Sequence, residues 1–136
     1  NLLANCLAAQ AAFEAGCLEA LLVDRDGTIT EGSHTSIFGV HKGRIMVTPM
    51  GPHILPGITR GLMVKLADRA GVEIVEGRLQ RSALADLDEM FLTGTTAEVL
   101  PVTEVDGRAI ADGRPGPVTQ RLVAAYAAYL RDWLAE

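Results

Sequence analysis

Lysine, cysteine and aromatic residues are scarce in this sequence, which has two lysines, two cysteines and 4% aromatic residues. No apolar run approaches the roughly 18 residues of a membrane-spanning helix, and no signal peptide is recognisable. The ten arginines are scattered and the net charge is −5, so no basic patch is expected. A membrane protein and a nucleic-acid-binding protein are therefore both disfavoured.

The sequence also lacks a CxxC pair and any cluster of cysteine and histidine, which argues against a metal site. Cys6 and Cys17 lie on or near one Ala-rich helix and are predicted to be buried, reduced thiols. This cysteine usage is typical of a cytoplasmic protein.

What is present indicates one globular domain, because 136 residues with 49% hydrophobic and 21% charged content can bury a modest core. There is no initiator methionine, and a helical pattern begins almost at once, with Asn1 as a candidate N-cap. We therefore expect the sequence to begin inside a longer protein.

Helical and strand patterns alternate, and several strands are paired by short turns, which predicts a mixed α/β domain and not a simple doubly wound sheet. Helices are expected over residues 1–15, 58–70 and 117–134, with a short helix capped by Ser82. Strands are expected over residues 18–23 (buried), 28–30, 35–40, 44–48, 72–75, 90–93 and 99–105.

The segment from Leu55 to Arg60 is a candidate phosphate site. Pro-Gly allows a sharp turn and close approach to a ligand, and the helix that follows presents free amides at Ile58 and Thr59. Thr59 adds a hydroxyl, and the positive end of the helix dipole favours an anion. The alternative is an ordinary helix start.

A second candidate anion site is Thr93 to Ala97, which follows a strand. Gly94 removes side-chain bulk, while Thr95 and Thr96 offer hydroxyls and backbone amides. The alternative is a polar turn whose threonine hydroxyls bond to their own backbone. The two segments support each other only if the fold brings them together.

Glu31 is the third candidate, because it follows Thr30 at a predicted strand end. A carboxylate beside a pyridine nitrogen keeps that nitrogen protonated and makes the ring an electron acceptor. The alternative is a solvated loop glutamate. Ser33, Thr35 and Ser36 have no partner that suggests a catalytic triad, and the three histidines lack metal-ligand spacing.

Three motifs occur in a fixed order: Glu31-Gly-Ser-His-Thr-Ser-Ile-Phe38, Leu55-Pro-Gly-Ile-Thr-Arg60 and Phe91-Leu-Thr-Gly-Thr-Thr-Ala-Glu98. In this order the sequence resembles the C-terminal part of the class IV (fold type IV) pyridoxal phosphate aminotransferases. That family includes the D-amino acid and branched-chain aminotransferases and aminodeoxychorismate lyase. The similarity covers nearly the whole chain and is greatest to the D-amino acid aminotransferases.

The resemblance implies a mixed α/β C-terminal domain over residues 1–136, in which β-hairpins and a mixed sheet or pseudobarrel carry flanking helices. It implies a cytoplasmic homodimer that uses pyridoxal 5'-phosphate to transfer an amino group between an amino acid and a 2-oxo acid. The alternatives are a lyase of the same fold, which releases pyruvate from aminodeoxychorismate, and a non-catalytic fragment of the fold.

Carried over by position, the resemblance also implies cofactor-binding roles. Glu31 would pair with the pyridine nitrogen, and Leu55 would pack against the ring. Ile58, Thr59 and Thr95 would donate to the phosphate. The full set of implied cofactor-binding residues is Glu31, Leu55, Gly57, Ile58, Thr59, Thr95 and Thr96, the last of them close to the substrate carboxylate or the phosphate.

Two departures from the family concern the cofactor. Many relatives have asparagine at the position of Ser36, and serine is shorter. The Schiff-base lysine of the family would fall a few residues before Asn1, while Lys42 is expected in a hairpin tip and Lys65 in a helix away from the site. No catalytic residue is therefore assigned within residues 1–136, and the small N-terminal domain of the family is expected to lie outside these residues.

Overall fold

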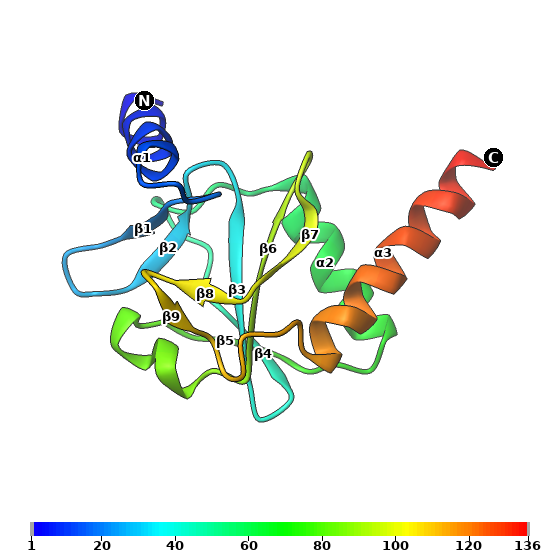
Figure 1. Ribbon diagram of the computed structural model, residues 1–136. Coiled ribbons are helices and arrows are strands. Elements are labelled where there is room, and N and C mark those ends of the chain that lie inside the picture. Colours follow the sequence, from blue (N-terminus) through cyan, green and yellow to red (C-terminus); the bar gives the residue numbers. More distant parts are fainter. Residues whose placement is uncertain (1, 136) are drawn as a thin grey trace.

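The computed structural model describes residues 2–135, and its centre is a five-stranded mixed sheet (Figure 1). The strand order is β5-β4-β3-β6-β7; β4 and β5 are parallel and the other neighbours are antiparallel. The mixed α/β fold is thus confirmed. The strands are β3 (Ser36–His41), β4 (Arg44–Val47), β5 (Ile74–Glu76), β6 (Glu89–Gly94) and β7 (Glu98–Val102).

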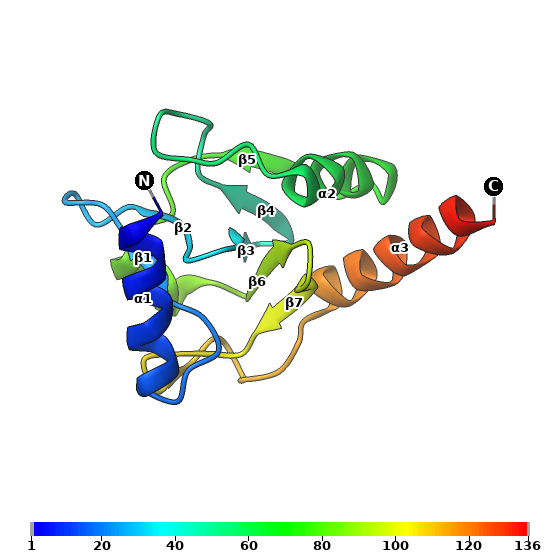
Figure 2. The same cartoon turned by 90° about the horizontal axis from the view of Figure 1, so that it is seen from above.

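Two small hairpins accompany this sheet, β1 (Leu21–Val23) with β2 (Ile29–Gly32) and β8 (Glu104–Val105) with β9 (Arg108–Ala109). The helices are α1 (Leu3–Glu14), α2 (Ile58–Arg69), the 3₁₀ helix η1 (Arg81–Asp86) and α3 (Pro117–Leu134). Figures 1 and 2 show α3 extending away from the sheet, while α1 stands beside the β1–β2 hairpin on the other side. None of the helices within residues 2–135 combines the length and apolarity needed to cross a membrane.

Apolar side chains cover both faces of the sheet. The central strands β3 and β6 point alternate side chains to opposite faces, and most of these side chains are apolar. Phe38 and Phe91 belong to the cluster that packs with α2 and α3, whereas Ile37 and Leu92 belong to the opposite cluster. Phe38 and Phe91 are cross-strand partners whose rings stack with centroids 4.9 Å apart. This alternation fixes the register of β3 against β6, since a one-residue slip would exchange the two faces.

Helix α3 begins at Gly116-Pro117 without a capping side chain of its own. Instead, the buried carboxylate of Glu89, on β6, accepts hydrogen bonds from the backbone amides of Val118 (2.9 Å) and Thr119 (2.7 Å). A strand residue therefore caps the helix and joins it to the sheet.

The predicted helices over 58–70 and 117–134 are confirmed, but three local predictions are wrong. The strand predicted from Leu18 is shorter and not buried: Leu18 is 82% exposed, because β1 belongs to a separate two-stranded hairpin. Ser82 lies inside η1, whose N-cap is Gln80. Cys6 and Cys17 are both exposed: Cys6 lies on α1, which buries no residue completely, and Cys17 lies in the linker that follows α1. The predicted N-cap at residue 1 lies outside the described residues.

Candidate functional site

The three predicted segments lie at one end of the central sheet (Figure 1). They contact one another through the start of β3, where Ser36 pairs with Thr93 of β6. A Cβ on Gly57 would lie 3.2 Å from Ser36 Oγ, and one on Gly94 would lie 3.4 Å from Thr35 Cγ2. The fold therefore brings together residues 31–36, 55–60 and 93–97, which we call the cradle.

Glu31 is held within the cradle by a backbone hydrogen bond. The Leu55 amide donates to Glu31 Oε2 at 2.9 Å, across 24 residues of sequence. Glu31 lies within β2, opposite Leu22 of β1, and not after a strand end as predicted. The carboxylate is half-buried, whereas the Leu55 side chain is 69% exposed. Glu31 is thus a tethered carboxylate and not a freely solvated one.

The start of α2 carries unused hydrogen-bond donors. Gly57 is the N-cap in an extended conformation and supplies no capping side chain. Within residues 2–135, no acceptor is found for the amides of Ile58, Thr59 and Arg60. Thr59 is buried at the same turn, while Ile58 is 91% exposed. A helix start with three free amides is suited to an anion.

Arg60 belongs to the same motif, although it is not among the predicted cofactor-binding residues. Its guanidinium donates to the Thr48 carbonyl at 2.8 Å and lies 5.9 Å from the centre of the Phe38 ring. Burial lowers the pKa of Arg60, and the negative charges of Glu76 and Glu31 oppose that shift. Arg60 thus fixes the first turn of α2 against the sheet and places a positive charge near Glu31.

The second predicted loop is the turn between β6 and β7. Thr95 and Thr96 are exposed, so their hydroxyls are accessible at the cradle. Thr93, at the end of β6, is 1% exposed, and its hydroxyl oxygen has no hydrogen-bond partner among the residues described. The turn thus combines accessible hydroxyls with one buried hydroxyl that lacks a partner.

Both lysines lie away from the cradle. Lys42 is in the β3–β4 turn, at the far end of β3, where its amide donates to the Asp88 carboxylate. Six residues of strand separate Ser36 from Lys42, which is about 20 Å. Lys65 is exposed on α2, seven residues after Ile58, or about 10 Å along the helix. Neither lysine therefore belongs to the cradle.

A largely buried hydrogen-bond network lies behind the β2–β3 turn, and none of the sequence predictions included it. The Glu19 carboxylate accepts hydrogen bonds from Ser33, and from Thr35 at 2.9 Å. Ser33 Oγ also lies 2.6 Å from His34 Nδ1. Glu19 lies 14 residues from Ser33, so no local pattern could have indicated this contact.

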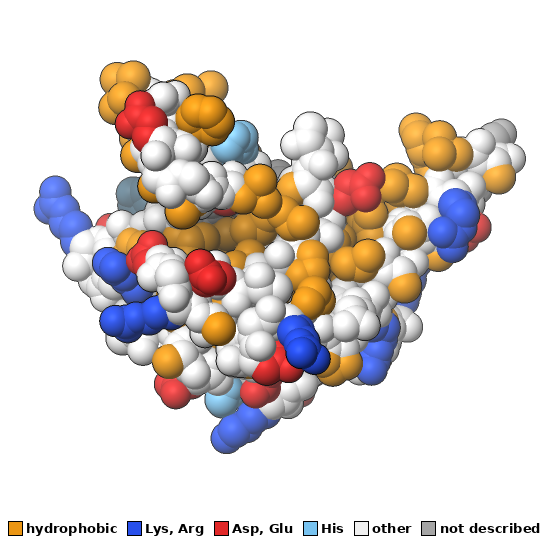
Figure 3. Space-filling view, in the orientation of Figure 1, with side chains coloured by type: hydrophobic (Ala, Val, Ile, Leu, Met, Phe, Trp, Pro, Cys, Tyr) orange, Lys and Arg blue, Asp and Glu red, His pale blue; other side chains and the backbone are white. Residues whose placement is uncertain are grey.

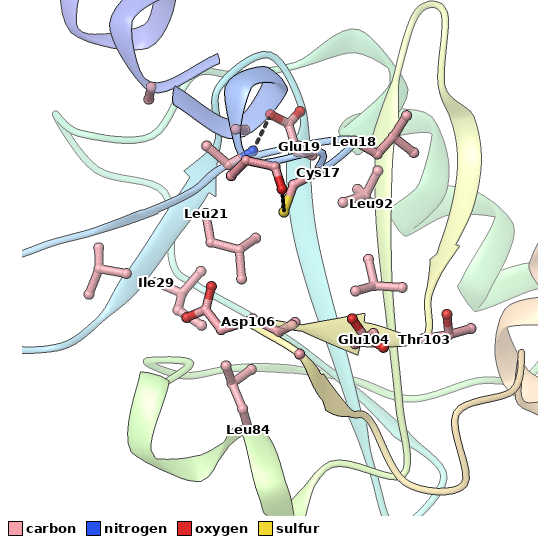
Figure 4. Close-up of a pocket in the computed structure, with 18 of the residues that line it drawn as sticks. Cys17, Leu18, Glu19, Leu21, Ile29, Leu84, Leu92, Thr103, Glu104 and Asp106 are labelled. Carbon is pink, nitrogen blue, oxygen red and sulfur yellow. Dashed lines mark hydrogen bonds between the residues drawn. The ribbon is translucent and has the colours of Figure 1, made fainter. Parts of the chain in front are cut away.

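A cavity of about 660 Å³ lies between α1, β1 and the β7–β8 segment. Figure 3 shows apolar side chains in the hollow beneath α1, and Figure 4 shows Leu21, Leu84 and Leu92 pointing into it. Its lining includes none of the seven predicted cofactor-binding residues. The hollow and the cradle are therefore different places on the molecule.

Comparison with known proteins places the chain among aminotransferases. The model of the family described as "Amino-transferase class IV" matches residues 1–105. A branched-chain-amino-acid aminotransferase of Pseudomonas aeruginosa is 45% identical over 120 residues, 88% of this chain and 39% of that protein. A D-alanine aminotransferase of Bacillus licheniformis is 40% identical over 125 residues, 92% of this chain and 44% of that protein.

Solved structures agree with these matches. The crystal structure of the T.th. branched-chain amino acid aminotransferase with pyridoxamine 5'-phosphate superimposes with a TM-score of 0.88 at 40% identity. The alignment covers 93% of this chain and 42% of that one, so the chain spans less than half the length of these relatives. Class IV aminotransferases are pyridoxal phosphate enzymes. The chain belongs to the class IV aminotransferase family.

Proposed function

We propose that the protein carrying this chain transfers an amino group between an amino acid and a 2-oxo acid, with pyridoxal 5'-phosphate as cofactor. The observation that carries the proposal is the hydrogen bond of the Leu55 amide to Glu31, which joins a carboxylate to the loop that opens α2. The cofactor supplies a pyridinium ring that accepts electrons from the substrate carbon as that carbon loses its proton.

Glu31 pairs with the ring nitrogen in this proposal. A carboxylate at that nitrogen favours its protonated form, because the two charges attract in a partly desolvated place. The Leu55 amide fixes one oxygen of the carboxylate and leaves the other for the ring. The exposed Leu55 side chain offers an apolar surface to the ring face.

The phosphate is bound by the remaining parts of the cradle. The free amides at Ile58 and Thr59, with Gly57 allowing close approach, suit a dianion at the positive end of α2. Thr95 adds a hydroxyl and Thr96 lies next to it, close to the phosphate or the substrate carboxylate. The donors present therefore fit a phosphorylated pyridine.

Three further parts of the proposal concern the rest of the protein. The Schiff-base lysine lies just upstream of residue 1, since Lys42 and Lys65 are remote from the cradle. The protein is a cytoplasmic homodimer. Large apolar side chains exposed on α1 and α3 support contact with further protein surface: Phe13 is 77% exposed and Trp133 is 62% exposed.

The test uses the natural-length protein loaded with pyridoxal phosphate. D-alanine and L-leucine are each offered with 2-oxoglutarate; turnover of D-alanine indicates the D-amino acid branch and turnover of L-leucine the branched-chain branch. Glu31→Gln should lower turnover by at least about 100-fold, because the neutral amide no longer favours the protonated ring. Glu14→Gln, on the exposed end of α1, is the matched control and should leave turnover unchanged.

Three results would contradict the proposal or a part of it. Release of pyruvate from aminodeoxychorismate without an amino acceptor would make the protein a lyase. Absence of any turnover and of any borohydride-reducible adduct would make it non-catalytic. Mapping the reduced adduct to Lys42 or Lys65 would refute the inferred position of the lysine.

A further inference from the structure

Glu19 lies in the linker between α1 and β1, at the edge of the cavity that Figure 4 shows. Its side chain is only 9% exposed, although no lysine or arginine is paired with it among the residues described. A carboxylate that is largely buried needs hydrogen-bond donors, and the polar groups around it therefore identify what it holds in place.

Four donors from two segments converge on this carboxylate. The amides of Ala20 (2.9 Å) and Ser33 (3.0 Å) and the Ser33 hydroxyl donate to Oε1, and the Thr35 hydroxyl donates to Oε2 at 2.9 Å. Three of the four come from the turn between β2 and β3. Asn5 of α1 holds the same turn from outside, by donating to the Ser33 carbonyl at 3.0 Å.

The charged form of Glu19 is favoured by these contacts. Burial by itself would raise the pKa of Glu19, but hydrogen bonds from Ser33, Ala20 and Thr35 and the nearby His34 lower it below the ordinary value. The carboxylate is therefore ionised at neutral pH. Its negative charge strengthens each hydrogen bond to the turn.

The turn that Glu19 holds, together with its two flanking residues, contacts both of the other segments of the cradle. Glu31 immediately precedes it and Ser36 immediately follows it. Its His34 carbonyl and Thr35 side chain pack at Gly94 of the β6–β7 turn, while Ser36 Oγ packs at Gly57 before α2. A Cβ on Gly32 would lie 2.1 Å from Thr35 Oγ1 and 3.0 Å from Glu19 Oε2, so there is no room for a side chain at this position of the turn.

We propose that Glu19 is a positioning residue for the cradle: by anchoring residues 32–35, it sets where the Glu31 carboxylate stands relative to Leu55 and to the two phosphate-binding segments. Glu19 does not touch the cofactor. The proposal rests on the proposed function for its catalytic meaning, but its geometric part is independent of any ligand.

The first experiment measures the hydrogen bond between Leu55 and Glu31 in the ligand-free protein at its natural length. Hydrogen exchange of the Leu55 amide, measured by NMR, reports the hydrogen bond to Glu31. Glu19→Gln turns one acceptor oxygen into a donor that faces the donors of the turn, so the Leu55 amide should exchange about tenfold faster or more. Amides in the middle of α2 should keep their protection, and Glu14→Gln should change neither.

The second experiment reads the consequence for a bound pyridine. Pyridoxamine 5'-phosphate labelled with ¹⁵N in the ring reports nitrogen protonation through its chemical shift, and its titration gives an affinity. Glu19→Gln should weaken binding about tenfold and shift the ring nitrogen toward its neutral form. Thr35→Val removes only one of the four donors and should act in the same direction with a smaller effect, which keeps the test open if Glu19→Gln does not fold.

The outcomes separate the two proposals. If a folded Glu19→Gln variant shows unchanged Leu55 exchange, or if Thr35→Val does so where Glu19→Gln is unfolded, the positioning role is refuted whether or not pyridoxamine phosphate binds. If Leu55 exchange rises as expected but the wild type does not bind pyridoxamine phosphate, the proposed function fails while the geometry stands. A loss of global stability without a change in the ring nitrogen signal would reduce Glu19 to a structural residue.

Discussion

Removing the carboxylate of Glu89 should detach α3 from the sheet and lower the stability of the whole domain. Glu89 is 5% exposed and accepts the amides of Val118 and Thr119, at 2.9 and 2.7 Å. Hydrogen bonds to charged groups contribute about 1.5–3 kcal/mol each, and loss of a helix cap costs about 0.5–2 kcal/mol. These values overlap and do not add, so we expect Glu89→Ala to cost about 3 kcal/mol.

The assay is urea unfolding followed by far-UV circular dichroism, because Trp133, the only tryptophan, is 62% exposed and would report folding poorly. With a slope of about 2 kcal/mol per molar urea, the midpoint should fall by about 1.5 M for Glu89→Ala. Glu73→Ala is the matched control, because Glu73 is exposed and its ion pair with Arg44 spans 3.9 Å. Its effect should stay below about 1 kcal/mol.

A double-mutant cycle between Gly116 and Glu89 tests whether the two residues pack against each other. A Cβ on Gly116 would lie 2.2 Å from Glu89 Cδ, so Gly116→Ala should destabilise the wild type by about 1–3 kcal/mol through overpacking. In the Glu89→Ala background that clash is gone, and the same substitution should cost at least about 1 kcal/mol less. Equal costs in both backgrounds, or a Glu89→Ala effect no larger than that of Glu73→Ala, would refute the capping role.

Three further predictions concern pH, thiols and the cradle. Because hydrogen bonds hold the pKa of Glu19 below 4.5 in the folded state, its contribution to stability is complete above pH 4.5 and lost as the pH falls through the folded value. The free energy of unfolding of Glu19→Gln should therefore fall less steeply with decreasing pH than that of the wild type. An equal pH dependence in the two proteins would contradict this. In a polypeptide of residues 1–136, Cys6 and Cys17 are exposed and should both react with a thiol reagent without denaturant; a thiol that reacts only after urea is added would contradict this. Gly57→Ala is compatible with the backbone at φ −64° and ψ 135°, but its Cβ would meet Ser36 Oγ at 3.2 Å. It should weaken pyridoxal phosphate binding at least about fivefold with less than about 1 kcal/mol of destabilisation, measured by titration and urea unfolding.

Local patterns were sufficient for the elements that carry their own start and stop signals. The helix from Ile58 is bounded by Gly57 and by Gly71, which has a φ of 68°, and both signals are readable in the sequence. The hairpin at Lys42-Gly43 has positive φ at both turn residues, as its two-residue loop requires. The two candidate loops also contain such glycine signals, so they could be located without knowing the order of strands in the sheet.

Interactions between distant residues could not be read in this way. The sequence shows no partner near Glu19 or Glu89, yet each carboxylate is largely buried and accepts hydrogen bonds from backbone amides 14 or about 30 residues away. The burial of Cys6 and Cys17 was wrongly predicted for a related reason. An Ala-rich helix looks like a core helix, but α1 meets the rest of the domain at few places, and an apolar pattern does not specify what covers it.

The two long helices that begin after glycine provide a comparison within the same chain. Gly57 and Gly116 are both extended N-caps without a capping side chain, so neither α2 nor α3 has a side chain at its N-cap that accepts its first amides. At α3 the protein supplies its own anion, the buried carboxylate of Glu89. At α2 no carboxylate within residues 2–135 accepts the corresponding amides, although Glu31 lies close enough to bind the amide of Leu55. A fold that caps one such helix internally and leaves the other open supports a bound anion at α2, because free amides and the positive end of a helix dipole attract negative charge.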